Sequence, residues 1–295
     1  MLAHESTTLP IGQIVCGHAA EVMAGWPSRS IDLIVTSPPY WNAVAYDGDM
    51  APWRSYAEYL AGLQTVWVEC ARVLRPAGKL CINAPLLPIE QKLMKQDTRV
   101  LKDIAGDIGR GILQGTDLRL CDQFIWQKQT SVRMKGTYPF PGHNYANNTI
   151  EFITVFVKPG KNKIVPAVKA ANRMPDTLHL NLTQQSWFMM PEDIRRQKGH
   201  PAPFPERLPA RLIRLYTFGA AEGFAGEIVL DPFVGTGTTC VAAKRMGGVE
   251  NYAAMARANV EKAAVDGGPV LLVSTPKQQT GGGTGEAGGD DGLNC

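Results

Sequence analysis

Two short apolar segments, each followed directly by an unusual loop, constrain this chain more than any other feature. "IDLIV" (31–35) runs into "TSPPYWN", and "EIVLD" (227–231) runs into "PFVGTGTT". Short β-branched runs of this kind are typical of parallel strands that helices cover on both faces. Ligands of open α/β sheets bind beyond the carboxyl ends of strands, so neighbouring strands would direct both loops into one cleft.

Strand-like and helix-like segments alternate along the rest of the chain. We expect helices over 54–74, 91–113 and 205–220, and further strands within 75–83, 121–128 and 149–158. This alternation predicts an α/β fold with a mostly parallel sheet and helices on both faces. Residues 159–199 lack clear periodicity and mix Pro, Lys, Arg and Asn, so we expect a small insert there rather than sheet.

Size and composition exclude several classes of protein. A chain of 295 residues can bury one large core or one domain with an insert. No apolar run approaches the ~20 residues of a membrane span, and the N-terminus lacks a secretory pattern, so we expect a cytoplasmic protein without a membrane partner. The six cysteines form no C-x-x-C pair, which argues against a metal site or a disulfide framework. The Gly-rich tail, 274–295, is expected to be disordered.

Charge is unevenly placed along the chain. Residues 119–214 hold 15 Lys and Arg against 6 Asp and Glu, a net charge of +9, whereas the remainder holds 15 against 21, a net charge of −6. A basic middle on an acidic body suggests a polyanionic partner. Charge alone is equally consistent with a solvated Lys/Arg surface.

The glycine-containing loop has the features of a ligand-binding turn. A strand ends at Asp231, Gly235 and Gly237 make a tight turn, and Thr238 opens a helix whose N-terminus offers N–H groups and the positive end of its dipole. The loop is not a Walker A motif, because no Lys follows, and Cys240 occupies the third glycine position of G-x-G-x-x-G. A lone G-x-G is more often a tight turn than a nucleotide site.

The "TSPPY" corner combines rigidity with hydrogen-bond acceptors. Pro38 and Pro39 fix the backbone and leave carbonyl groups to accept hydrogen bonds, Ser37 adds a hydroxyl, and Tyr40 adds a π-face. Such a corner suits the exocyclic amino group of a stacked heterocyclic base. The alternative is an ordinary turn stiffened by proline.

Together the two loops resemble a known family. "DPFVGTGTT" looks like the S-adenosylmethionine loop of DNA amino-methyltransferases, and "TSPPYW" like their catalytic loop, in the order of the permuted β group. The resemblance covers roughly residues 12–262. It implies a Rossmann-like S-adenosylmethionine-dependent methyltransferase fold: a catalytic half (12–158), a target-recognition insert (159–199), a cofactor-binding half (200–273) and the tail (274–295).

The resemblance also assigns residues to the cofactor. It points to Asp231, Phe233, Gly235, Gly237 and Thr238 in the loop, with Phe204 against the same ligand. Two positions depart from the family pattern. Only "GGVENY" follows the helix, so the strand before the candidate ribose ligand Glu250 is short, and His18 stands where the family usually has Asp near the adenine.

The implied reaction is a direct methyl transfer to a flipped-out base. Tyr40 would stack on the base, and Ser37 Oγ with the Pro38 carbonyl would accept hydrogen bonds from its amine. Ser before Pro-Pro-Tyr resembles the N4-cytosine enzymes, whereas Asp there would indicate N6-adenine. The loop within 126–148, with Lys128, Arg133 and Lys135 among aromatics, suits DNA phosphates.

Several alternatives stay open. The chain could instead be an N6-adenine methyltransferase, or a DNA-binding protein on a catalytically impaired version of the same fold. An RNA or small-molecule methyltransferase is less consistent with the basic insert. For a double-stranded DNA enzyme, both a restriction–modification role with a cognate endonuclease and an orphan or phage role are open, as are a monomer and a homodimer.

Overall fold

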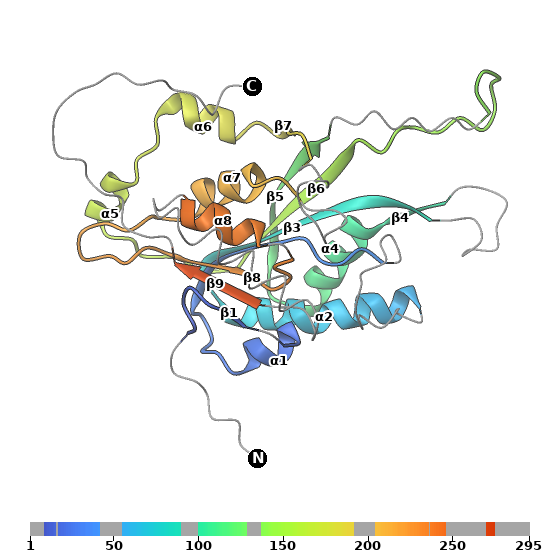
Figure 1. The fold of residues 1–295 in the computed structure, drawn as a ribbon. Coiled ribbons are helices and arrows are strands. Elements are labelled where there is room, and N and C mark those ends of the chain that lie inside the picture. The colour runs from blue at the N-terminus through green and yellow to red at the C-terminus, as the bar shows by residue number, and fades with distance from the viewer. Residues whose placement is uncertain are drawn as a thin grey trace, which may run out of the picture.

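The computed structural model describes residues 9–15, 17–41, 55–89, 100–128, 137–191, 204–235, 237–245 and 270–274, with the backbone alone for Ile89 and 270–274. These residues form one nine-stranded sheet with helices on both faces (Figure 1). The strands are β1 (Ile14–Val15), β2 (Ile31–Thr36), β3 (Leu74–Ile89), β4 (Val100–Asp103), β5 (Arg119–Gln127), β6 (Ile150–Val157), β7 (Ser186–Phe188), β8 (Ile228–Asp231) and β9 (Val270–Ser274). The helices are α1 (Ala19–Ala24), α2 (Tyr56–Val73), α4 (Ile104–Gly115), α5 (Pro166–Ala171), α6 (Asp176–Leu182), α7 (Arg207–Tyr216) and α8 (Thr238–Arg245). Among them, none is long and apolar enough to cross a membrane.

The strand order places β2 near the centre of the sheet. The order is β1-β9-β8-β2-β3-β6-β5-β7, with β4 paired to β3, and β2 runs parallel to both β3 and β8. The predicted α/β class with helices on both faces is therefore confirmed. The sheet is more mixed than expected, because three of its eight strand pairings are parallel and five antiparallel. β6 returns antiparallel between β3 and β5, and β9 antiparallel between β8 and β1.

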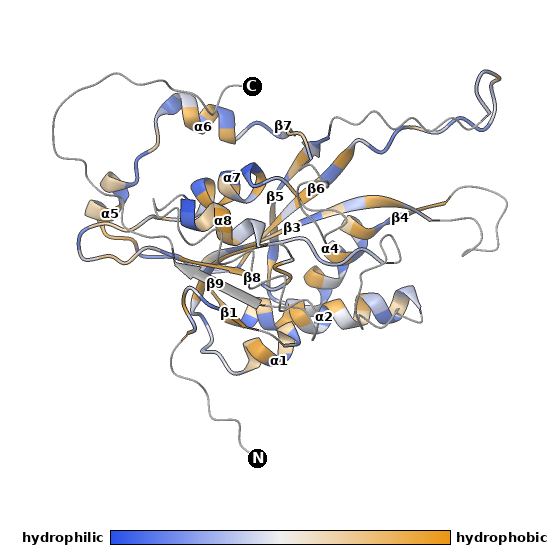
Figure 2. Ribbon diagram, viewed as in Figure 1, coloured by the Kyte–Doolittle hydropathy of each residue, from blue (hydrophilic) through white to orange (hydrophobic). Residues whose placement is uncertain are grey.

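Alternation along β2 explains why both faces of the sheet are covered. All six of its residues are buried. Ile34 packs into a core that includes α1, α2 and α4, whereas Leu33 and Val35 pack into a second core with α7 and α8. Figure 1 shows these two helical layers on opposite sides of the sheet, and Figure 2 shows apolar residues predominating along β3 between them. Burial on both faces is what the short apolar run predicted.

The structure differs from the expectation for residues 91–113. Val100–Asp103 form strand β4, which pairs antiparallel with β3, and helix α4 begins only at Ile104. The Asp103 side chain caps this helix by accepting a hydrogen bond from the Gly106 amide at 2.9 Å, which ends the strand and starts the helix within one residue. Residues 91–99 lie outside the described part of the chain.

The segment 159–199, expected to be an insert rather than sheet, also contributes a strand. It contains α5 and α6, as its irregular composition allows, but β7 pairs parallel with β5 at the edge of the sheet. Trp187 of β7 is buried and stacks on Phe124 of β5, with ring centroids 4.5 Å apart. This aromatic contact holds the short strand in place despite its three-residue length.

Packing of α2 gives a direct test of the core. Leu63 on α2 is 2% exposed within the first core, whereas Leu113 on α4 is 45% exposed. We expect Leu63→Ala to lower the free energy of unfolding by about 2–5 kcal/mol, because the buried site loses both transfer energy and packing. The matched Leu113→Ala should cost no more than about 0.5 kcal/mol. Urea unfolding would measure both, and equal losses would contradict this assignment of the core.

Candidate active site

The two unusual loops leave the same edge of the sheet side by side. β2 and β8 are parallel neighbours, with Leu33 opposite Val229 and Ile34 opposite Leu230. Their carboxyl ends are joined by a hydrogen bond of 2.6 Å from Thr36 Oγ1 to Asp231 Oδ1. The sequence predicted a shared cleft on the condition that the two strands are neighbours. This condition is confirmed.

Asp231 is the buried link between the loops. It is 1% exposed, and besides the bond from Thr36 it accepts hydrogen bonds from the Phe233 amide at 3.0 Å and from Thr239 Oγ1 at 2.7 Å. Burial raises the pKa of this carboxyl to about 6, against the lowering effect of the three hydrogen bonds. The carboxylate thus fixes the strand end, the loop and the start of α8 relative to one another.

The turn between Asp231 and α8 has the backbone that its glycines permit. Gly235 and Gly237 have φ angles of 49° and 81°, a region in which residues with a Cβ are rarely found. The Gly237 amide closes the turn on the Val234 carbonyl at 2.8 Å. A turn that lacks Cβ atoms at these two positions, and that ends at the N-terminus of α8, lets an anionic or polar ligand approach the backbone closely.

The remaining residues assigned to the cofactor lie around this turn to different extents. The Phe233 ring meets Trp67 of α2 edge-to-face, with centroids 5.8 Å apart, and Phe204 packs against the second core, which also contains Val234. His18 is exposed and precedes α1. Because β1 and β8 are both antiparallel to β9, β1 ends at the same edge as β8, so His18 follows a strand end level with the glycine loop. Glu250 lies outside the described residues.

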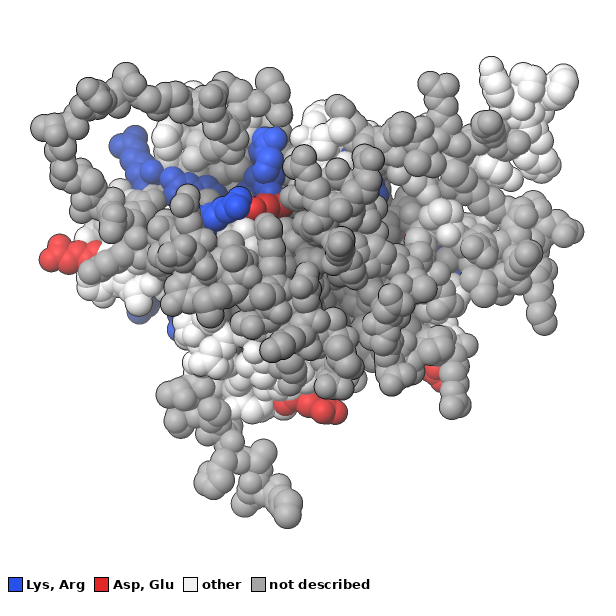
Figure 3. Space-filling view, viewed as in Figure 1, with Lys and Arg blue, Asp and Glu red and all other residues white. Residues whose placement is uncertain are grey.

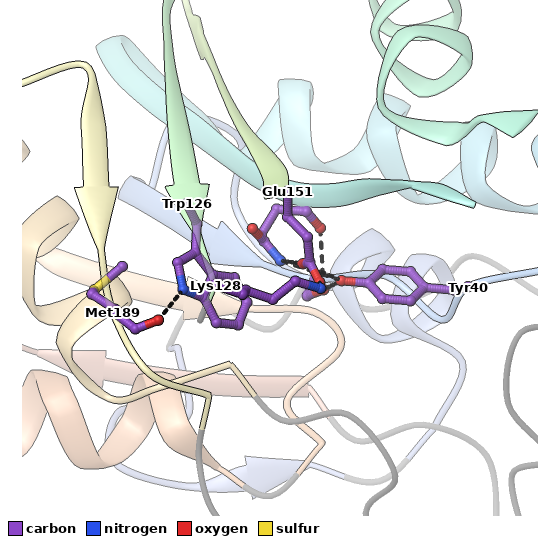
Figure 4. A network of polar contacts seen from close by, with 7 residues as sticks. Tyr40, Trp126, Lys128, Glu151 and Met189 are labelled. Carbon is purple, nitrogen blue, oxygen red and sulfur yellow. Dashed lines mark hydrogen bonds and ion pairs between the residues drawn. The ribbon is translucent and has the colours of Figure 1, made fainter. Parts of the chain in front are cut away.

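A polar network surrounds the "SPPY" corner (Figure 4). Ser37 Oγ lies 2.8 Å from the Tyr40 hydroxyl and 3.1 Å from the Asn83 carbonyl oxygen. The Tyr40 hydroxyl donates to Glu151 Oε2 at 3.0 Å, and Asn83 Nδ2 donates to the same carboxylate oxygen. Lys128 Nζ completes the network with an ion pair to Glu151 Oε1 at 2.6 Å.

Asn83 and Glu151 are functional candidates that the sequence reasoning missed. They lie on the neighbouring strands β3 and β6, where the register puts Pro85 opposite Glu151 and Asn83 opposite Ile153, so both side chains share one face. Both are buried, with 2% and 6% exposure. A single carboxylate inside the apolar run "TIEFITVFV" was a signal for such a site, but its partners depend on strand order and register.

Lys128, predicted to contact DNA phosphates, lies inside this network. Its ammonium group is committed to Glu151 and lies 5.5 Å from the centre of the Trp126 ring. The other two candidates for phosphate contact, Arg133 and Lys135, fall outside the described residues. Figure 3 shows Lys and Arg side chains gathered over α7 and α8, elements whose partly or fully exposed cations are Arg207, Arg214, Lys244 and Arg245. Arg211 of α7 is buried and donates to the Asn181 carbonyl.

Comparison with known proteins gives a consistent picture. A family model described as DNA methylase matches residues 31–259. Type II beta methyltransferase M.BslI of Bacillus sp. is 26% identical over 78% of this chain and 25% of its own length. Type II methyltransferase M.MthZI of Methanothermobacter thermautotrophicus is 28% identical over 73% of this chain and 65% of its own length. The chain therefore spans a quarter to two thirds of these two relatives.

Solved structures resemble the fold over most of its length. A protein of Thermus thermophilus, assigned as a DNA modification methylase and solved with S-adenosyl-L-methionine, is 29% identical, with a TM-score of 0.62 over 84% of this chain and 94% of that chain. PvuII DNA methyltransferase (cytosine-N4-specific) has a TM-score of 0.54 over 84% of this chain and 89% of its own, at 15% identity. At that identity the second comparison supports the fold alone.

The buried carboxyl of Asp231 predicts a pH dependence of stability. Its pKa rises from 3.8 to about 6 on folding, so the folded state binds the proton more tightly. The stabilisation from this protonation is complete below about pH 4 and lost as the pH rises through 6. In Asp231→Asn, the amide oxygen can accept from Thr36 and the Phe233 amide while the amide nitrogen donates to Thr239, and nothing titrates.

We therefore expect the stability of the wild type relative to Asp231→Asn to fall between pH 4 and pH 6. At about 1.36 kcal/mol per pKa unit, the fall should be on the order of 3 kcal/mol. Urea unfolding of both proteins at pH 4, 5, 6 and 7 measures the difference. A difference that does not vary with pH, or that grows as pH rises, would contradict a raised pKa.

Proposed function

The chain belongs to the DNA methylase family of N6/N4 methyltransferases, and we propose that it transfers a methyl group from S-adenosylmethionine to the exocyclic N4 amine of cytosine in double-stranded DNA. The observation that carries the proposal is the junction of the two loops. The "SPPY" corner and the glycine turn leave adjacent parallel strands, and the bond from Thr36 to Asp231 holds them together. A group bound by one loop therefore lies next to a group bound by the other.

The residues of the glycine turn fit the cofactor. Two glycines with positive φ open the backbone, α8 begins directly after them, and Phe204 and Phe233 provide apolar surface near the turn. Asp231 acts through the backbone here, because its carboxylate is buried and already hydrogen-bonded. When bound, S-adenosylmethionine supplies an electrophilic methyl group on its sulfonium sulfur.

The "SPPY" corner would bind and orient the amine. Flipping the base out of the duplex costs a few kcal/mol, and stacking on the Tyr40 ring would return about 1–3 kcal/mol of this. Ser37 Oγ and the Pro38 carbonyl would accept the two N–H groups of the amine. Accepting both protons from one side localises the nitrogen lone pair on the other, so positioning and electrostatics drive an in-line transfer.

The choice of cytosine rests on Ser37 and its resemblance to the N4-cytosine enzymes. The same corner fits the N6 amine of adenine, which is the alternative substrate. The partner is double-stranded DNA, and the cations over α7 and α8 supply a surface of suitable charge (Figure 3). A role beside a cognate restriction endonuclease is consistent with the Type II methyltransferases among the relatives.

The activity is tested by incubating the protein with methyl-labelled S-adenosylmethionine and unmethylated mixed-sequence DNA, then digesting the DNA to nucleosides. We expect labelled N4-methylcytosine. Labelled N6-methyladenine would overturn the base assignment while leaving the methyltransferase assignment in place. DNA binding without transfer would overturn the enzymatic proposal and favour the binding-protein alternative.

The glycine turn generates a second prediction. Gly237→Ala should weaken S-adenosylmethionine binding at least ~10-fold, because a Cβ at a φ of 81° strains or displaces the turn. Gly223→Ala is the matched control: Gly223 also has a positive φ of 71°, but a Cβ added there would meet no atom within 4 Å, and the residue precedes β8 instead of following it. Calorimetric titration measures both. Equal affinities in the two variants would contradict the cofactor site.

A further inference from the structure

Glu151 is in a position to decide how protons are distributed around Ser37. Its carboxylate has no proton to give when ionised, so every neighbour must donate to it. Lys128 donates to Oε1, while Tyr40 and Asn83 donate to Oε2. Figure 4 shows Tyr40 and Lys128 pointing toward Glu151 from opposite sides.

The donors and acceptors in the hydrogen bonds beyond Tyr40 follow from counting protons. A tyrosine hydroxyl has a single proton, so donating it to Glu151 leaves the Tyr40 oxygen as an acceptor. The Ser37 hydroxyl, 2.8 Å away, can then donate to Tyr40, or to the Asn83 carbonyl at 3.1 Å. In both cases the single Ser37 proton is engaged by an acceptor within the protein, and the Ser37 oxygen keeps lone pairs for an incoming donor.

Resting on the proposed function, we propose that Glu151 is a positioning residue for methyl transfer: it orients the hydrogen bonds of Tyr40 so that Ser37 Oγ presents only lone pairs to the amine. Lys128 fixes the carboxylate in this role instead of contacting a DNA phosphate. The amine is thereby recognised as a donor, because a Ser37 oxygen without a proton to offer cannot donate to a carbonyl group in the same place.

The surrounding structure holds this arrangement rigidly. Glu151 is directly opposite Trp126 in the sheet, and the Trp126 indole donates to the Met189 carbonyl at 2.9 Å. The Lys128 ammonium lies over the same ring. The carbonyl of Met189, directly after β7, thus fixes the aromatic side chain next to the ion pair of Lys128 and Glu151 (Figure 4).

The network predicts an unusual outcome for Glu151→Gln. Lys128 can only donate, so the new amide must turn its oxygen to Lys128 and its NH₂ group to Tyr40 and Asn83. Asn83 can reverse its own amide to suit, because its Oδ1 is buried with no hydrogen-bond partner among the described residues. Tyr40 then accepts from the amide and donates to Ser37, which loses a lone pair needed by the amine.

We expect Glu151→Gln to lower kcat roughly 10- to 100-fold, the effect of one charge-assisted hydrogen bond, with the affinities for S-adenosylmethionine and DNA changed less than about 2-fold. Adding Lys128→Met should partly restore kcat, because the amide oxygen is then released to face Tyr40. A merely structural role for Glu151 predicts the reverse, a double variant worse than the single one. Glu222→Gln, which alters an exposed carboxylate, is the control and should leave kcat unchanged.

Lys128 is tested separately from Glu151. Lys128→Met should lower kcat without changing the salt dependence of DNA binding, and Lys128→Arg should recover activity by keeping the cation. A phosphate contact would instead reduce the slope of log affinity against log salt by about 0.9. If Glu151→Gln does not fold, the comparison of Met and Arg at position 128 decides the proposal: recovery with Arg supports it, and equal loss overturns it.

Measuring methyl transfer by the wild type distinguishes a failure of the proposed function from a failure of the inference about Glu151. A wild type without transfer overturns the proposed function together with this inference. An active wild type with full kcat in Glu151→Gln, or with no recovery in the double variant, overturns the inference alone.

Discussion

The hydrogen bond between Thr36 and Asp231 is the contact on which the site depends. It links the last residues of two neighbouring parallel strands, one of which continues directly into the "SPPY" corner and the other into the glycine loop. Since the same carboxylate also binds the Phe233 amide and Thr239, one buried group fixes the orientation of both loops. Burial of this carboxylate is unfavourable, as its raised pKa shows. An uncharged group in its place would accept the three hydrogen bonds less strongly.

A second buried carboxylate has a different role on the other side of β2. Glu151 is ionically paired to Lys128, whereas the described surroundings of Asp231 hold only hydroxyl and amide donors. One carboxylate therefore binds the backbone and a hydroxyl group of the glycine loop and α8, and the other binds the Tyr40 hydroxyl of the "SPPY" corner. Both networks meet at the carboxyl end of β2: Thr36 contacts Asp231, and the next residue, Ser37, contacts Tyr40.

Much of the fold could be predicted from local sequence. The runs "IDLIV" and "EIVLD" are β2 and β8, the amphipathic stretch after Ser55 is α2, and the family expected from the two loops is confirmed by the match to residues 31–259. β4 was missed because Val100 and Leu101 fit the helical spacing that follows them. Only the long-range pairing with β3 makes those residues a strand, and periodicity contains no information on such pairing.

The candidate site likewise contains residues that local sequence could predict and residues that it could not. Ser37, Tyr40 and the glycines could be named as candidates from sequence because each belongs to a motif of residues next to one another in the chain. Asn83, Lys128 and Glu151 come from three different parts of the sheet, and only the order β2-β3-β6-β5 brings them together. Lys128 shows the consequence most clearly: by sequence it belongs to a basic loop, but the antiparallel pairing of β5 with β6 directs its ammonium group to a carboxylate. Local charge therefore predicted a phosphate contact, whereas the register of the sheet places this lysine beside the carboxylate to which the Tyr40 hydroxyl donates.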